Sequence, residues 1–477
     1  MTVVTQAPAR SGRWSEALLL LLAIAAGFGA FTLSYWGLGF EGFPDQLPRL
    51  LALTVGTALV AHLLIRKFAP YADPVLFPSA LALNGIGLAM IYRIDVSQGA
   101  SKVHGQFLLT FVGIALAVAT VIVLRDHRLL RRFTWTSLVV GIILLLLPLV
   151  PGLGVYVYGA RIWINVLGFS YQPAELAKIM LAIFFAGYLV AERDNLSLAG
   201  PKFLGIRLPK ARHFVPILAA WAFCMAVLVL ENDFGTALLF FGMFVAMIYV
   251  ATERVSWLVI GGLLSLGGIV FVATQVPHIE ARFHGWLHAL DADVYDAQYG
   301  SYQLVQGLFG MASGGLFGTG LGQGYPTRAF AADSDFIFAS IAEELGLVGA
   351  IAILCIYLVI VMRGLRIAVN IRDGFGKLLA AGLSITIALQ CFVIIGGVTR
   401  LIPITGLALP FLAHGGSALL TNWIIIGLLL RMSNSVRAPA PAPVLPSPDS
   451  LDIPSAAVPT GEHSPEDSKV TEVVPQQ

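Results

Sequence analysis

The chain has 477 residues, of which 57% are hydrophobic and only 12% charged, and its mean hydropathy is +0.84. Soluble domains carry about 25% charged residues, so this composition excludes a soluble globular protein. The formal net charge of +2 gives no sign of a nucleic-acid partner. The three cysteines fall inside apolar runs, which favours small buried side chains over a disulfide framework or a metal site.

Long apolar runs without alternation predict membrane-spanning helices. Because a bilayer accepts only helices or a closed barrel, the predicted fold is an all-α polytopic membrane protein with about 12 transmembrane helices. These helices are expected near residues 16–38, 48–65, 75–92, 105–124, 133–152, 173–191, 214–230, 234–252, 256–275, 336–362, 378–399 and 407–430.

The basic residues sort to one side of this arrangement. With alternating connections, about 20 Lys and Arg residues lie on the side of the N-terminus and about 7 on the other. The positive-inside rule then places both termini in the cytoplasm. Residues 1–15 show no cleavable-signal pattern and are expected to be a cytoplasmic N-terminus. The Pro-, Ala-, Ser- and Glu-rich residues 433–477 are expected to be a disordered cytoplasmic tail.

One connection, residues 276–335, is much longer than the usual link between packed elements. It is rich in Trp, Tyr, Phe and Gly rather than in the residues of disordered chains, which predicts a large, folded extracellular loop. Its acidic cluster includes Asp296, which is set among Tyr295, Tyr299 and Tyr302. That partly apolar setting favours a general base, although a solvated acidic loop is the alternative.

Three further stretches place polar groups at the ends of spans, where they are costly without a role. Glu175 and Lys178 lie on one helical face, as a self-neutralising pair or as a cation that faces an anionic substrate. Asp233 follows a tight turn and is either a helix N-cap or part of an acidic edge. Arg400 precedes a Pro- and Gly-rich break, where a phosphate would meet it.

Five motifs follow one another along residues 75–432. They are GARIWI with QPAELAK (159–164 and 172–178), DFGT (233–236), Asp296 six residues before Tyr302, DFIFASIAEELG (335–346), and LIPITGLALPFLAHGGS (401–417). This combination resembles the SEDS family of RodA, FtsW and SpoVE, which are polytopic glycosyltransferases that polymerise lipid II into peptidoglycan. The layout, with two additional N-terminal helices, is most similar to actinobacterial RodA.

The resemblance implies a ten-helix core over residues 75–432, preceded by two extra transmembrane helices in residues 16–74. It implies that Asp296 is the general base, which takes the proton of the attacking 4-hydroxyl while undecaprenyl diphosphate leaves. Taken together, the resemblance and the placement of charges predict a set of substrate-binding residues: Lys178, Glu175, Arg400, Asp233, Asp335 and Ser417. Arg400 comes from its placement alone, because the family usually has Gly at that position. No protein metal site is expected, but a divalent cation (Mg²⁺ or Mn²⁺) at the diphosphate stays open.

The implied setting is the bacterial cytoplasmic membrane, with a class B penicillin-binding protein transpeptidase as partner and a role in elongation and shape rather than in division. Two other functions fit the residues. A lipid II flippase would use buried charges and broken helices equally well. A scaffold that only recruits the transpeptidase would tolerate loss of Asp296 and Lys178 together.

Overall fold

The computed structural model describes residues 13–157, 160–166, 168–193, 202–203, 206–207, 211–275, 277–297 and 300–439. Within these residues, ten helices are long and apolar enough to cross a membrane. Two shorter apolar helices, Leu218–Leu230 and Ser256–Phe271, accompany them. The prediction of an all-α polytopic membrane protein with about 12 helices is confirmed. The predicted tail lies almost entirely outside the described residues.

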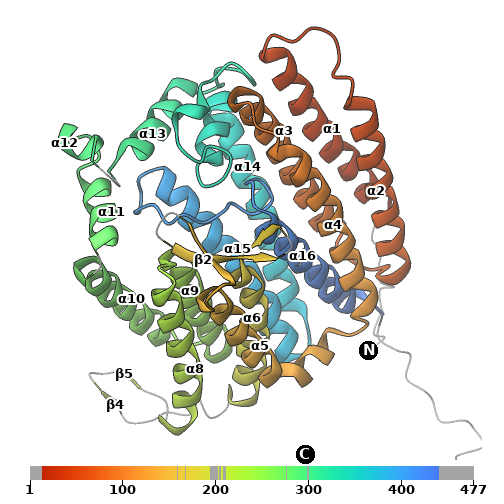
Figure 1. The fold of residues 1–477 in the computed structure, drawn as a ribbon. Helices are drawn as coiled ribbons and strands as arrows, with labels where there is room; N and C mark the ends of the chain where they lie inside the picture. The colour runs from red at the N-terminus through yellow and green to blue at the C-terminus, as the bar shows by residue number, and fades with distance from the viewer. Residues whose placement is uncertain are drawn as a thin grey trace, which may run out of the picture. The chain divides into compact units, whose positions relative to one another are not determined.

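The first four helices pack as two layers at one edge of the fold (Figure 1). Helix α1 (Arg13–Gly37) packs on α3 (Leu76–Gln98), and α2 (Leu47–Phe68) packs on α4 (Lys102–Val123). The backbones of α1 and α3 approach closely at two glycines, since a Cβ on Gly27 would lie 2.9 Å from the Cα of Gly85. Small residues of this kind allow tight helix packing in membranes.

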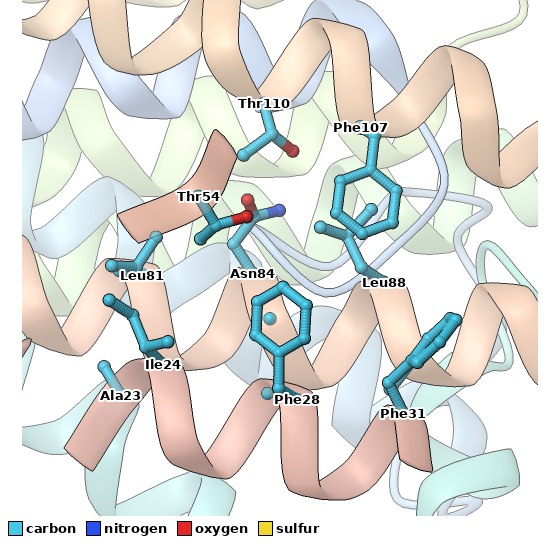
Figure 2. A pocket seen from close by; sticks show the side chains of 13 residues that line it. Ala23, Ile24, Phe28, Phe31, Thr54, Leu81, Asn84, Leu88, Phe107 and Thr110 are labelled. Atoms are coloured by element: carbon cyan, nitrogen blue, oxygen red, sulfur yellow. The ribbon is translucent and has the colours of Figure 1, made fainter. Parts of the chain in front are cut away.

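A small cavity of about 30 Å³ remains between α1, α3 and α4. Figure 2 shows Phe28, Phe31 and Phe107 around it, with Asn84 as a polar member. A space of this size holds about one water molecule, so it is a packing gap and not a substrate site.

A short antiparallel sheet interrupts the helices and was not predicted. Helix α5 (Thr134–Leu146), flanked by η1 (His127–Phe133) and η2 (Leu147–Leu149), leads into β1 (Gly154–Val157), β2 (Ala160–Val166) and β3 (Phe169–Tyr171). The sheet delivers the chain to α6 (Pro173–Ala191), which begins at Pro173 as expected. A second, two-stranded sheet pairs β4 (Lys202–Phe203) with β5 (Ile206–Arg207).

The long connection is folded over its described residues, as predicted. It follows α8 (Ala211–Leu230), α9 (Phe234–Thr252) and α10 (Ser256–Gln275). It contains α11 (Pro277–Leu287), α12 (Ala292–Tyr295), α13 (Tyr302–Gly314) and η3 (Pro326–Arg328). Helix α13 packs on α14 (Ile337–Asn370). This contact anchors the long connection, residues 276–335 and called the cap below, to the membrane-spanning body.

The last third of the chain contains two breaks in helical geometry. Helix α14 is interrupted at Gly346, whose φ of 68° only glycine adopts readily. Helix α15 (Gly374–Val398) is followed by irregular backbone, and α16 (Gly416–Arg437) begins nine residues later than the span expected from residue 407. The prediction was wrong there because Pro403 and Pro410 remove backbone donors from that stretch, as the motif itself indicates.

Candidate functional site

The predicted pair on α6 is formed and buried. The Nζ of Lys178 lies 2.8 Å from the Oε2 of Glu175, and the Lys178 side chain is 1% exposed. The same Nζ donates to the Oε1 of Gln390 on α15 at 3.0 Å, and the Gln390 amide donates to the carbonyl of Ala408 at 2.9 Å. Gln390 was missed because an uncharged amide within an apolar run carries little signal. The pair thus links α6 to α15 and to the irregular segment before α16.

Asp233 is the N-cap of α9, which confirms one of its two interpretations. Its carboxylate accepts from the backbone N–H of Thr236 at 3.0 Å and from the amide of Gln172 at 3.4 Å. Burial raises the pKa of Asp233, and the charge of Glu175 adds to this effect. The carboxylates of Asp233 and Glu175 are therefore close enough to affect each other's charge.

Asp335 faces a cation that the sequence analysis did not identify, Arg282 on α11. Burial raises the pKa of Asp335 to about 6, and Arg282 opposes this rise. The surrounding protein lowers the pKa of Arg282, while Asp335 and Asp233 act to hold it up. Over the described residues, the exposed Arg282 side chain forms no hydrogen bond or ion pair. The geometry therefore brings Asp233, Asp335 and an uncommitted arginine together.

Arg282 stands at an apolar groove of about 390 Å³, here called the α8–α11 groove. Its walls come from α8, α9, α10, α11 and the Ile402–Thr405 backbone, and they include Trp221, Phe241 and Phe283. Gly235 keeps this wall close, since a Cβ there would lie 2.7 Å from the carbonyl oxygen of Thr405. A long apolar slot with one cation suits an apolar chain that ends in an anionic group.

A further acid, Glu231, lies buried in the turn between α8 and α9. Both of its carboxylate oxygens lack a hydrogen-bond partner in the described structure. Burial raises the pKa of Glu231 to about 9, with the neighbouring charge of Asp233 acting in the same direction. Glu231 is therefore protonated at neutral pH and adds no charge to the groove.

Asp296 lies at the C-terminal end of α12 and is exposed. The expectation of a partly apolar setting is wrong for this conformation. The rings of Tyr295 and Tyr302 are 5.2 Å apart, but they do not enclose the carboxylate, and Tyr299 lies outside the described residues. Figure 1 shows α12 at the periphery, well apart from α6, so Asp296 is not brought together with the buried pair.

Arg400 and Ser417 differ in their surroundings. Arg400 adopts a φ of 62° and donates from Nε and Nη2 to the carbonyls of Trp286 and Leu287, at 3.0 and 2.9 Å. The indole N–H of Trp286 donates back to the Arg400 carbonyl. Arg400 thus fastens the end of α11 to the irregular segment. Ser417, at the start of α16, is buried, and its hydroxyl finds no partner in the described structure.

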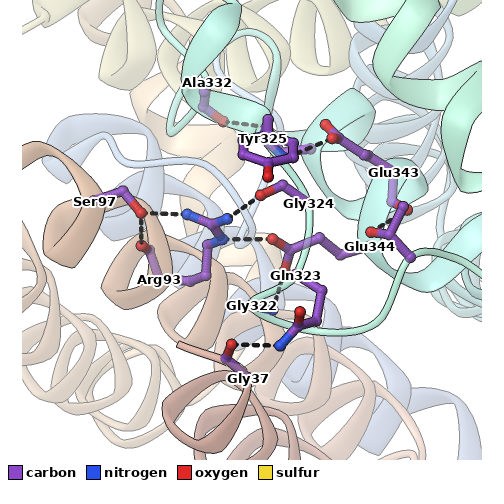
Figure 3. Close-up of polar contacts among 12 residues, drawn as sticks. Gly37, Arg93, Ser97, Gly322, Gln323, Gly324, Tyr325, Ala332, Glu343 and Glu344 are labelled. Atoms are coloured by element: carbon purple, nitrogen blue, oxygen red, sulfur yellow. Dashed lines mark hydrogen bonds and ion pairs between the residues drawn. The ribbon is translucent and has the colours of Figure 1, made fainter. Parts of the chain in front are cut away.

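The two glutamates of the EELG motif are both satisfied. Figure 3 shows Arg93 of α3 between Glu344, Ser97 and the carbonyl of Gly324. The second oxygen of Glu344 accepts from the backbone N–H of Gly322 at 2.8 Å, and Glu343 accepts from that of Tyr325 at 2.6 Å. This network, called the Arg93 network below, fixes the Gly-rich run against α3 and α14.

No group of three or more His, Cys, Asp or Glu side chains that could hold a metal ion occurs within the described ranges. The divalent cation expected at a substrate diphosphate stays a prediction.

Comparisons with known proteins identify the family. The model of the cell cycle protein family of FtsW, RodA and SpoVE matches residues 74–438. The peptidoglycan glycosyltransferase RodA of Mycobacterium tuberculosis is 44% identical, over 92% of this chain and 94% of that protein. The stage V sporulation protein E of Bacillus subtilis is 33% identical, over 78% and 99%.

Among solved structures, the fold matches a chain from one that is described as structural coordination of polymerization and crosslinking by a peptidoglycan synthase complex. It covers 76% of this chain and 98% of its own at 22% identity, with a TM-score of 0.62. The resemblance stated from the motifs is confirmed, and this chain belongs to the cell cycle protein family of FtsW, RodA and SpoVE.

Proposed function

We propose that this chain is a peptidoglycan glycosyltransferase that polymerises lipid II at the outer face of the cytoplasmic membrane. Its relatives at 44% identity are named for the glycosyltransferase activity. The observation that carries the proposal for this chain is the α8–α11 groove with Arg282 at its side. The groove suits a polyprenyl chain, and the arginine suits the diphosphate that links this chain to the sugar.

The reaction joins two lipid-linked disaccharides. The 4-hydroxyl oxygen of one attacks the anomeric carbon of the other, and the bond from that carbon to the diphosphate oxygen breaks. Asp296 takes the hydroxyl proton, and undecaprenyl diphosphate leaves with the bonding electron pair. Because Asp296 is exposed and α12 lies apart from α6, the cap must bring Asp296 to the bound substrate during turnover.

One cation, Arg282, contacts the substrate, whereas Lys178 and Arg400 act without touching it. Arg282 is exposed and uncommitted, so it is the better candidate to contact the leaving diphosphate. Lys178 is buried and already bound to Glu175 and Gln390, so it stabilises negative charge through the field of the cluster. Arg400 positions α11, which carries Arg282. Asp233 and Asp335 favour the charged form of Arg282, whereas the buried hydroxyl of Ser417 is out of reach of a substrate in this conformation.

The proposal includes the cellular setting. Both termini lie in the cytoplasm and the cap faces outward, as the distribution of basic residues predicts. The partner is a class B penicillin-binding protein transpeptidase. The function is elongation and shape rather than division, which the identity to mycobacterial RodA supports.

The test is polymerisation of lipid II by the purified full chain, alone and with its cognate transpeptidase, for wild type and Asp296→Asn. We expect polymer from wild type and none from the variant, at equal protein levels in the membrane. Absence of polymer from wild type with the partner present, together with transbilayer movement of lipid II, would replace the proposal by the flippase function. Equal polymer from both proteins would remove Asp296 as the base.

A further inference from the structure

The cap contains a second cavity of about 380 Å³, here called the cap pocket, whose lining mixes apolar and polar side chains. It lies between α13, η3 and the first turns of α14, and no residue of the α8–α11 groove lines it. Its size falls within the range of small-molecule sites in proteins. No step of the proposed reaction uses the cap pocket.

The cap pocket has charges of opposite sign on two walls. Arg328 is exposed and lies over the ring of Tyr325, with its guanidinium carbon 4.8 Å from the ring centre. Within the described ranges, its guanidinium makes no hydrogen bond or ion pair. Glu343 of α14 also lines the pocket, is 5% exposed and accepts from the N–H of Tyr325. A cation held flat by an aromatic ring is oriented before any ligand arrives.

The remaining lining combines exposed aromatic faces with short polar side chains. Tyr325 is 65% and Phe309 59% exposed, so both rings have surface available to a ligand in the pocket that they line. Gln306, Ser313 and Thr319 add amide and hydroxyl groups to the wall. Aromatic faces beside hydrogen-bonding groups suit a sugar ring, which has apolar faces and a polar edge.

One hydrogen bond connects this pocket to the predicted base. The Nε2 of Gln306, on the pocket wall, donates to the hydroxyl of Tyr295 at 2.7 Å, and Tyr295 directly precedes Asp296. A ligand that engages Gln306 therefore acts on the segment that carries Asp296. This places the cap pocket beside the chemistry rather than at an unrelated surface.

We propose that the cap pocket binds a saccharide that carries an acidic peptide, with the sugar against Tyr325 and Phe309 and a peptide carboxylate on Arg328. The proposal rests on the proposed function, because it assigns the pocket to one sugar–peptide unit of the substrate or product strand. The buried Glu343 accepts a hydrogen bond from a sugar hydroxyl or amide. Through Gln306, the bound unit fixes the position of the Asp296 segment.

The experiment measures binding without turnover, using the full chain with Asp296→Asn in detergent. The probe is a soluble disaccharide–pentapeptide without lipid or diphosphate, compared with the free pentapeptide and a neutral N-acetylglucosamine disaccharide. Arg328→Gln is compared with Arg49→Gln, an exposed arginine of α2 that does not line the pocket. Thermal unfolding of each variant checks that the fold is retained.

We expect saturable binding of the disaccharide–pentapeptide, with Kd raised about 10-fold or more by Arg328→Gln and unchanged by Arg49→Gln, since a charge-assisted hydrogen bond is lost. Tyr325→Ala should weaken the neutral disaccharide as well, whereas Arg328→Gln should not. Absence of saturable binding, equal Kd values for the two arginine variants, or tight binding of the free pentapeptide alone would overturn the proposal.

Polymerisation by the corresponding variants with Asp296 intact separates this proposal from the function. Arg328→Gln should raise KM for lipid II several-fold with little change in kcat. A wild type that polymerises but shows no probe binding sinks the cap pocket and leaves the function standing. A wild type that binds the probe but makes no polymer would keep the cap pocket as a saccharide site and overturn the proposed polymerase function.

Discussion

Two buried charges of the membrane-spanning body and three exposed charges of the cap have opposite surroundings. In the body, Lys178 and Glu344 are almost fully buried, and each has a partner of opposite charge. In the cap and at its edge, Arg282, Asp296 and Arg328 are exposed, and their side chains form no ion pair in the described structure. Burial of an unpaired charge is very costly, so pairing is compulsory in the body, whereas water allows the cap to keep its charges uncommitted.

This difference separates structural charges from charges that are available to a ligand. A paired and buried charge stabilises the arrangement of helices, and its removal should disturb folding together with function. An exposed and unpaired charge contributes little to stability, so its removal should affect function alone. Four experiments on Asp296, the Arg93 network, the α6 pair and Asp335 test this division.

The largest effect is expected for Asp296→Asn, which removes the general base and should lower the polymerisation rate about 10²–10⁴-fold. Because the side chain is exposed, thermal unfolding should stay unchanged. The measurement pairs initial rates on lipid II with melting in detergent. Asp293→Asn, at an exposed neighbouring acid on the same short helix, is the matched control. A large loss of stability in Asp296→Asn would assign Asp296 to the structural class.

A substitution in the Arg93 network should instead lower the stability of the protein. Glu344→Gln leaves Arg93 buried without its counter-charge, which should destabilise the protein by about 3–5 kcal/mol. The double variant Arg93→Met/Glu344→Gln removes both charges and should recover much of this loss. Melting temperature and the yield of folded protein provide the measurement. A double variant as unstable as Glu344→Gln alone would show that the hydrogen bonds to the Gly-rich run matter more than the ion pair.

The α6 pair lies between these two classes, because it is buried but adjoins the site. Lys178→Met alone should lower both stability and activity, since Glu175 loses its partner. Lys178→Met/Glu175→Gln should restore most of the stability while activity stays about 10-fold or more below wild type, if the field of Lys178 acts on the substrate. Restoration of activity along with stability would reduce the pair to a packing element.

The smallest effect is a pH dependence at Asp335, whose pKa is raised to about 6 by burial. As pH falls through about 6, Asp335 gains a proton and no longer attracts Arg282, so activity should decline by a few-fold. Asp335→Asn should remove this acidic limb between pH 5 and 7. The contribution of Asp335 to the free energy of unfolding should instead increase as pH falls. A pKa raised above the ordinary 3.8 favours the folded state when protonated, and this contribution is lost as pH rises through about 6.

Some individual features of the site could be predicted from local sequence, and others could not. Pro173 predicted the start of α6, and the three-residue spacing predicted the pair of Glu175 and Lys178. Asp233 was recognised as a possible N-cap from its place in a tight turn. Arg282 and Gln390 were missed, because their importance depends on partners that lie far away in the chain.

The membrane class, the approximate number of helices, the family and the presence of a folded cap could all be predicted from the sequence. These features follow from apolar run length, composition and motif order, which are local properties of the chain. Only the tertiary structure decided which charges are paired and which are free. Exposure of Asp296, the commitment of Arg400 to α11, and the α8–α11 groove all depend on packing between distant segments. Hydropathy sums over neighbours in the chain, whereas a site is formed by neighbours in space.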